Sequence, residues 1–186
     1  MKRRLFGTSG IRGVVNVDLT PTLAVDVGLA VATHTNSGTV AVGHDTRVSS
    51  PMLEWAVVSG LLSGGSKVYR LGLVPTPVLA FLTRELGADA GVMITASHNP
   101  PEYNGVKLFS GDSIGYDEGQ QNRIEEIVGD RLFKMPPWQN IGDATTVDEA
   151  HRYLETVQKA MELQKKWRVV LDMGCGATCH IAPLVF

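Results

Sequence analysis

Cysteine is scarce in this chain, with Cys175 and Cys179 the only two among 186 residues. Two cysteines that lie so close together do not form a disulfide framework, so we expect free thiols. No apolar run reaches the roughly 20 residues that a membrane-spanning helix needs, so no membrane partner is predicted. Neither sign of charge dominates, since 17 basic residues face 19 acidic ones, and this balance argues against a nucleic-acid partner. Together these absences favour a cytoplasmic protein.

What remains is the composition of an ordinary globular protein, 44% apolar and 19% charged. Helices that start with a hydroxyl residue followed by proline are predicted at residues 20–34, 50–63 and 76–86. Strands are predicted at residues 39–43, 67–71, 90–95 and 105–110. This alternation predicts an α/β fold with a three-layer α/β/α domain. The last strand returns antiparallel after a loop, so the sheet is predicted to be mixed.

The remaining residues predict the start of a second domain. A polar helix is expected over residues 117–128, and residues 130–146 have no clear periodicity. Another helix over 148–164 and a strand over 167–172 follow, but the chain ends at Phe186, before the next helix of such a unit. We therefore expect one domain over residues 1–146 and the truncated beginning of a second α/β domain over residues 147–186.

One motif, Thr95-Ala96-Ser97-His98-Asn99-Pro100, follows the apolar strand 90–95. Open α/β sheets bind ligands beyond the carboxyl ends of their strands, so a reactive serine fits this place. The same residues also suit a simple Asn-Pro turn. A hydrolase triad is not indicated, because the serine lacks the Gly-x-Ser-x-Gly context and no acid is placed to orient His98. A phosphoryl group on the hydroxyl, with a metal to neutralise it, would supply the missing reactivity.

Two further motifs could bind an anion beside this serine. The stretch 7–13 holds three glycines, two hydroxyls and Arg12, which could bring N–H groups and a guanidinium onto an oxyanion, or could form a flexible start. The stretch Asn104-Gly105-Val106-Lys107 places Lys107 on the returning strand, close to Ser97. That lysine could stabilise phosphate or transfer protons. It could also be a surface lysine that only keeps an exposed edge strand from pairing with another chain.

The stretch 43–50 contributes Asp45 and Arg47, for which a structural ion pair under the loops is favoured over direct catalysis. Other patterns are near misses. Residues 60–67 lack the P-loop spacing, and residues 174–179 lack the third glycine of a dinucleotide fingerprint. The spacing of Cys175, Cys179 and His180 is poor for a metal site.

Residues 6–13, 43–47, 95–100 and 104–107, in this order along the chain, resemble the motifs of the α-D-phosphohexomutase superfamily, which includes phosphoglucomutases, phosphomannomutases and phosphoglucosamine mutases. The resemblance covers residues 1 to about 145 as the first domain of that family, and the serine motif is its most specific part. It implies a phosphotransferase that interconverts hexose 1-phosphate and hexose 6-phosphate through a phosphoserine and a bisphosphate intermediate.

The resemblance also implies roles for single residues. Ser97 would carry the phosphoryl group, His98 would hydrogen-bond in the site, and Arg12 and Lys107 would support phosphoryl and proton transfer. The residues expected to bind substrate or phosphate are Thr8, Ser9, Arg12, Asn99 and Lys107. Mg²⁺ would bridge the Ser97 phosphate and an aspartate-rich loop of the second domain.

The chain departs from the family in two respects. Bacterial phosphoglucosamine mutases usually carry Asp where Ser9 stands, which favours an archaeal-type or broad-specificity enzyme. The metal loop, the sugar-recognition loop and the C-terminal phosphate clamp are absent from these 186 residues, so missing domains are expected to complete the site. A non-catalytic domain that binds phosphate or a partner is the alternative, and a dinucleotide enzyme starting at Val169 is a third. The motifs specify no oligomeric state.

Overall fold

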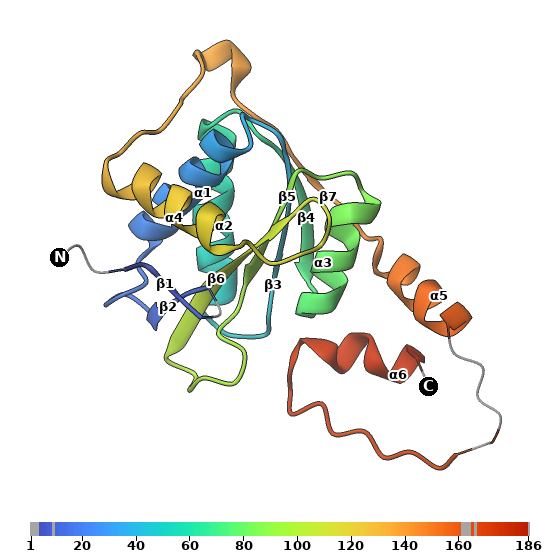
Figure 1. The fold of residues 1–186 in the computed structure, drawn as a ribbon. Helices are drawn as coiled ribbons and strands as arrows, with labels where there is room; N and C mark the ends of the chain where they lie inside the picture. The colour runs from blue at the N-terminus through green and yellow to red at the C-terminus, as the bar shows by residue number, and fades with distance from the viewer. Residues whose placement is uncertain (1–3, 9, 161–164, 166, 186) are drawn as a thin grey trace.

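The computed structural model describes residues 4–8, 10–160, 165 and 167–185. Its centre is one mixed sheet of seven strands in the order β1-β2-β6-β5-β3-β4-β7 (Figure 1). The strands are β1 (Phe6–Gly7), β2 (Gly10–Val14), β3 (Thr39–His44), β4 (Lys67–Leu73), β5 (Ala90–Ile94), β6 (Tyr103–Ser110) and β7 (Ala144–Thr146). β3 pairs in parallel with β4 and β5, and β4 pairs in parallel with β7. β6 pairs antiparallel with β5 and β2, and β2 pairs antiparallel with β1, which confirms a mixed sheet.

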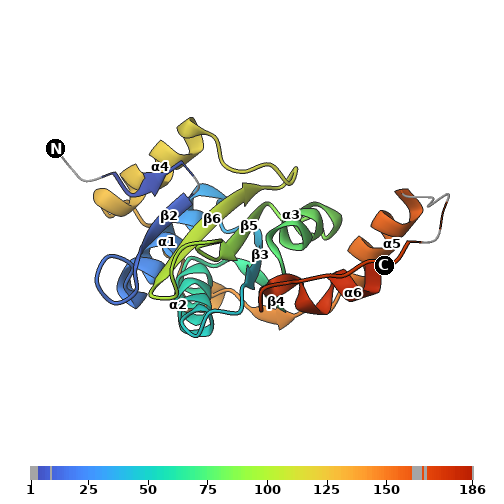
Figure 2. The same ribbon diagram turned by 90° about the horizontal axis from the view of Figure 1, so that it is seen from below.

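Helices cover both faces of this sheet. They are α1 (Pro21–His34), α2 (Ser50–Ser63), α3 (Thr76–Glu85), α4 (Glu118–Gly129), α5 (Ala150–Ala160) and α6 (Ala182–Val185), with two 3₁₀ turns, Trp138–Asn140 and Ala177–His180. α1, α2 and α4 lie on one face and α3 on the other, while α5 and α6 lie side by side beyond α3 (Figures 1 and 2). The predicted α/β/α layers are therefore confirmed. None of the described helices combines the length and the apolar character needed to cross a membrane.

Local chemistry explains where the helices begin. Thr20 accepts a hydrogen bond from the Leu23 amide at 3.2 Å, and Pro21 occupies the first helical position of α1. Asp117 and Gln120 form a reciprocal capping box at the start of α4. α2 differs from its prediction, because its N-cap is Ser49 and the next residue, Ser50, turns its hydroxyl inward.

The two faces of the sheet bury separate apolar clusters. Val40, Val42 and Val92 pack against α1 and α2, and Ala41 and Met93 face α3. All five residues of β5 are buried, as predicted for a central strand covered on both faces. The sheet is thereby held rigid at its centre, where β3 and β5 are neighbours.

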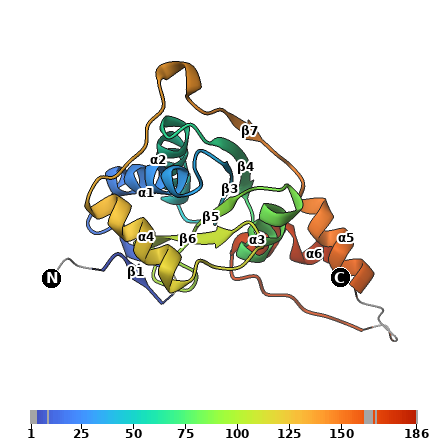
Figure 3. The ribbon, with the colours of Figure 1, turned by 45° about the horizontal axis from the view of Figure 1, so that its top comes forward.

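Three segments differ from their predictions. Residues 6–7 and 10–14 pair as the strands β1 and β2 instead of forming a loop, because β2 also pairs with β6. Residues 130–146 contain a 3₁₀ turn and β7, and they pass beyond the ends of α1 and α2 (Figure 3) with Gly142 donating to the Leu62 carbonyl. Residues 167–172 do not form the predicted strand, since no strand in the described part of the chain pairs with them, and Trp167 and Val170 are exposed.

The contact between α1 and α2 generates a stability prediction. A Cβ atom on Gly60 would lie 2.2 Å from the carbonyl oxygen of Val25, a backbone atom that cannot swing away. We expect Gly60→Ala to lower the free energy of unfolding by about 1–3 kcal/mol, measured by urea denaturation. The matched control is Gly115→Ala after β6, where the nearest atom to a Cβ is the Leu108 carbonyl oxygen at 4.0 Å, so stability is expected to stay unchanged or rise by about 0.5 kcal/mol. Equal effects of the two substitutions would contradict the packing argument.

Candidate functional site

The site lies at the carboxyl ends of β3 and β5. The chain leaves β3 toward β4 on one side and later returns to form β5 on the other side, so the connecting helices α2 and α3 lie on opposite faces. This is the topological switch point at which open α/β sheets bind ligands. A cleft of about 500 Å³ opens there. Its walls are the loops that follow β3, β4 and β5, together with residues 174–178.

Ser97 stands at the exposed tip of the loop after β5. Its hydroxyl oxygen lies 2.9 Å from the Lys107 ammonium and 3.5 Å from the Arg12 guanidinium. The backbone of Ser97 is left-handed, with φ 56°, a conformation that costs a non-glycine residue roughly 1–2 kcal/mol. A turn does form here, because the Asn99 amide donates to the Ala96 carbonyl at 3.1 Å. The turn therefore presents the serine hydroxyl to two cations. The motif forms a turn and also places a serine where it can react, so the two interpretations of its sequence are compatible.

The two cations come from neighbouring strands. Arg12 on β2 pairs with Gly105 on β6, so Arg12 and Lys107 project from the same face of the sheet. Gly105 leaves room for this, since a Cβ there would lie 3.1 Å from the Arg12 side chain and 2.7 Å from the Thr95 carbonyl. Arg12 is aimed by Asn99, whose side-chain oxygen accepts from it at 2.7 Å.

Lys107 has an altered proton affinity. Its side chain is half-buried, and both this burial and the Arg12 guanidinium nearby lower its pKa below 10.5. A lysine with a lowered pKa gives up and regains a proton more readily near neutral pH. Because its ammonium already donates to the Ser97 oxygen, the group that could protonate that oxygen is in place.

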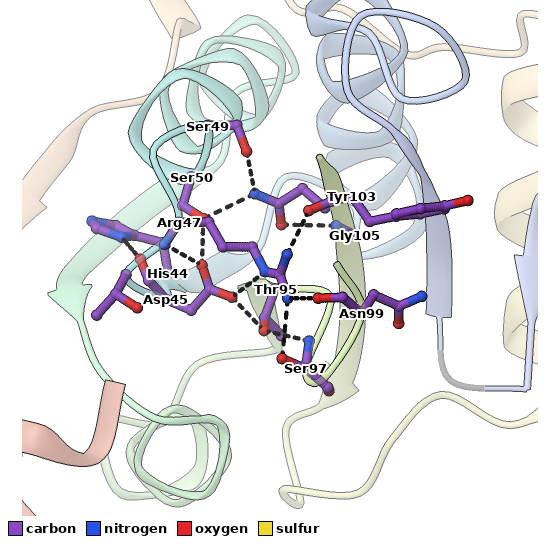
Figure 4. A network of polar contacts seen from close by, with 12 residues as sticks. His44, Asp45, Arg47, Ser49, Ser50, Thr95, Ser97, Asn99, Tyr103 and Gly105 are labelled. Carbon is purple, nitrogen blue, oxygen red and sulfur yellow. Dashed lines mark hydrogen bonds and ion pairs between the residues drawn. The ribbon is translucent and has the colours of Figure 1, made fainter. Parts of the chain in front are cut away.

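Beneath the serine loop lies the expected ion pair of Asp45 and Arg47 (Figure 4). The Arg47 Nε donates to Asp45 at 3.3 Å, and the two terminal nitrogens of Arg47 donate to four backbone carbonyl oxygens. These carbonyls belong to Ser97, Asn99, Pro100 and Tyr103. The predicted ion pair beneath the loop is confirmed.

A family model described as phosphoglucomutase/phosphomannomutase, alpha/beta/alpha domain I, matches residues 3–135. The chain belongs to this phosphohexomutase family. The suspected resemblance is therefore confirmed.

Individual relatives agree with the family. A protein of Methanothermobacter thermautotrophicus named "Probable phosphoglucosamine mutase" is 47% identical over 186 residues, all of this chain and 41% of the relative. The phosphoglucosamine mutase of Thermoanaerobacter pseudethanolicus is 44% identical over 98% of this chain and 42% of its own length. The crystal structure of a phosphoglucomutase/phosphomannomutase family protein from Burkholderia thailandensis superposes with a TM-score of 0.76 at 29% identity, covering 87% of this chain and 37% of that one. The chain thus spans about 40% of the curated relatives it matches.

The other residues predicted for the site differ in whether they line the main cleft of this phosphohexomutase domain. Thr8 is exposed and shares a cavity of about 260 Å³ with Lys107, on the side of the lysine toward β1. Ser9 lies outside the described residues. Asn99 lines the main cleft, but His98, which is exposed on the same loop, is not among the described residues that line it.

One wall of the cleft was missed by sequence reasoning. Residues 174–178 lie across the cleft from Ser97, and the Thr46 hydroxyl donates to the Cys175 carbonyl at 3.0 Å. The sequence of this stretch indicates an incomplete dinucleotide fingerprint and, with Cys175, a poor metal site, and neither pattern predicts a wall of this cleft. The signal that could have suggested a ligand-facing loop was the position of this stretch directly after the strand predicted over residues 167–172.

The described residues do not form a metal site by themselves. None of their His, Cys, Asp and Glu side chains gather in groups of three or more that could hold a metal ion. The carboxylate in the cleft, Asp45, is fully engaged by the Arg47 amide, the Arg47 side chain, Ser50 and Thr95. Cys175 and Cys179 are free thiols. A divalent cation at Ser97 would therefore need ligands beyond those that the described residues supply.

The pKa of Lys107 can be tested directly. We expect Arg12→Gln to raise this pKa by removing a nearby positive charge, while burial still keeps it below 10.5. The folded state binds this proton less tightly than the unfolded chain does, so the free energy of unfolding should rise with pH between the lowered pKa and 10.5. Side-chain NMR of lysine over a pH titration measures the shift, with Arg84→Gln on α3 as the control. An unchanged Lys107 pKa in Arg12→Gln would refute the electrostatic contribution.

Proposed function

We propose that this chain is the phosphoserine-bearing part of a phosphohexomutase, an enzyme that interconverts hexose 1-phosphate and hexose 6-phosphate. The observation that carries the proposal is the Ser97 hydroxyl, exposed at the edge of a 500 Å³ cleft with Lys107 at 2.9 Å and Arg12 at 3.5 Å. A dianionic phosphoryl group on that oxygen would lie between two cations, which is the arrangement that phosphoryl transfer requires. Family membership supports the same reaction.

The first transfer moves the phosphoryl group from Ser97 to a hydroxyl of the sugar monophosphate. The bond from phosphorus to the serine oxygen breaks, a bond from phosphorus to the sugar oxygen forms, and the sugar hydroxyl releases its proton to water. Lys107 donates its proton to the departing serine oxygen, and Arg12 stabilises the charge on the phosphoryl oxygens. The product is a hexose bisphosphate in the cleft.

The second transfer runs in the opposite direction with the other phosphate. The bisphosphate turns over, Lys107 now takes the Ser97 proton, and the serine oxygen attacks the phosphorus that was on the substrate at the start. The departing sugar oxygen regains a proton from water, so protons and phosphoryl groups balance over the cycle. Positioning and electrostatics supply the catalysis, since little covalent work is left to the protein.

The remaining site residues have supporting roles in this proposal. Asn99 orients Arg12 through their hydrogen bond, and Thr8, Ser9 and His98 are proposed to contact phosphate or sugar hydroxyls. Among hexose phosphates, the names of the curated relatives favour glucosamine phosphate.

The rest of the machinery is proposed to come from other domains of the enzyme. We propose Mg²⁺ as the cofactor, because a divalent cation neutralises phosphoryl charge, with the Ser97 phosphate as the one ligand from these residues. The domain limits 1–146 and 147–186 and a cytoplasmic location stay predictions of the sequence. On this proposal the 186 residues alone do not complete a catalytic cycle.

The alternative is a non-catalytic domain that keeps the fold and binds phosphate or a partner. Both proposals predict anion binding beside Lys107 and Arg12. They differ in whether Ser97 becomes a covalent carrier.

Intact mass spectrometry of the protein purified from its native cells tests the carrier. We expect a fraction of the molecules to be heavier by one phosphoryl group, with the phosphopeptide containing Ser97, and we expect Ser97→Ala to abolish that fraction. Ser110→Ala on β6 is the matched control and should keep it. Native protein that never carries phosphate on Ser97, under conditions where hexose phosphates are abundant, would exclude the mutase and favour the binding domain.

A further inference from the structure

Arg47 binds the backbone of the serine loop, residues 97–103, through four hydrogen bonds. Its Nη2 donates to the carbonyls of Ser97 at 3.1 Å and Asn99 at 2.7 Å, and its Nη1 donates to those of Pro100 at 2.7 Å and Tyr103 at 2.9 Å. The guanidinium thus ties both ends of a seven-residue loop to one planar group (Figure 4). The Arg47 side chain is 13% exposed, its bonds to Asn99 and Tyr103 are partly buried, and those to Ser97 and Pro100 are exposed.

The guanidinium is itself held in place. Asp45 receives the Arg47 Nε, and the same carboxylate accepts from Ser50 at 2.5 Å and Thr95 at 2.7 Å. The Thr95 hydroxyl in turn accepts from the amide of Ser97 at 3.0 Å. Two sets of hydrogen bonds therefore hold the loop: Arg47 binds its carbonyl groups, and Thr95 binds the Ser97 amide.

We propose that Arg47 is a positioning residue for the phosphoryl-carrying serine: by binding the carbonyls of residues 97, 99, 100 and 103 it holds Ser97 in its left-handed conformation, with the hydroxyl between Lys107 and Arg12. Asp45 and Thr95 complete this positioning unit. This inference rests on the proposed function, in which Ser97 is the carrier.

The arrangement has a direct electrostatic effect on the carrier. Carbonyl oxygens repel a phosphoryl dianion, and Arg47 draws four of them toward itself, on the inner side of the loop. The phosphoryl group on the outer side then faces Lys107 and Arg12. A lysine in place of Arg47 would keep the charge but not the planar set of donors that reaches four acceptors, so Arg47→Lys separates geometry from charge.

The test installs phosphoserine at position 97 by genetic code expansion and follows the second ionisation of the phosphate by ³¹P NMR. In the parent chain we expect the phosphate pKa to lie about one unit or more below its usual value of about 6, because two cations stabilise the dianion. In Arg47→Lys we expect the pKa to recover by about half of that shift, since the loop no longer holds the phosphate between the cations. Arg84→Lys on α3, an exposed arginine paired with Glu85, is the control and should leave the pKa unchanged.

A second pair of variants tests the hydrogen bond between the Ser97 amide and the Thr95 hydroxyl. Thr95→Val removes the hydroxyl that Ser97 and Asp45 share, and it should raise the phosphate pKa, whereas Thr95→Ser keeps the hydroxyl and should restore the parent value. Thermal unfolding of every variant is measured beside the titration. An Arg47→Lys or Thr95→Val chain that unfolds cooperatively and keeps the parent phosphate pKa would overturn the proposal. So would an Arg47→Lys chain that fails to fold while Thr95→Val matches Thr95→Ser.

The phosphate titration tests the positioning role of Arg47, and intact mass spectrometry tests whether Ser97 carries phosphate, so either result can be negative without the other. Phosphoserine is installed during synthesis, so the titration reports on Arg47 whether or not the native protein phosphorylates Ser97. If the native protein carries no phosphate and the pKa still follows Arg47, the proposed function is lost and the positioning of residue 97 remains. If the native protein carries phosphate on Ser97 but the phosphate pKa does not change in Arg47→Lys, the proposed function remains and the positioning role of Arg47 is lost.

Discussion

Asp45 is a buried carboxylate beneath an exposed loop, and the site depends on how that charge is satisfied. Its side chain is 12% exposed, and removing one partner of such a pair typically costs about 3–5 kcal/mol. Arg47 satisfies it with charge, while Ser50 and Thr95 complete the hydrogen bonds. Asn104 then anchors Ser50 from the start of β6. One desolvated charge thus links the ends of β3 and β5 with the starts of α2 and β6, which are far apart in the sequence.

The topology of the sheet explains why these segments meet. β3 and β5 run parallel as neighbours, so the loops that follow them emerge at the same edge. β6 turns back along β5 from that edge, which brings Lys107 opposite Met93 and within reach of the serine loop. β2 adds Arg12 on the far side of β6. A parallel pair provides the floor of the site, and an antiparallel return provides its cations.

Much of this was predictable, and the remainder has physical reasons. Thr-Pro and Ser-Pro pairs indicated the starts of the three helices, and the returning strand correctly placed Lys107 near Ser97, although Asn104-Gly105 lies inside β6 and forms no turn. The four acceptors of Arg47 were hidden, because backbone carbonyls leave no trace in residue types. On α2 the apolar side chains of Met52 and Trp55 are exposed. The opposite face with Leu53 and Val57 packs instead, and Trp55 stacks on Arg70. A helix that is apolar all round does not reveal its buried side.

The far wall of the cleft is attached more lightly than its floor. Residues 174–178 meet the first loop through the Thr46–Cys175 hydrogen bond, and Ile181 is buried in the cluster around α3. Such a hydrogen bond contributes only about 1 kcal/mol, whereas the floor is tied by a dense set of charged contacts. In the proposed reaction a sugar bisphosphate rotates between two half-reactions, and this rotation requires space in the cleft. Residues 174–178 are therefore expected to separate from the first loop at a lower free-energy cost than the serine loop separates from Arg47.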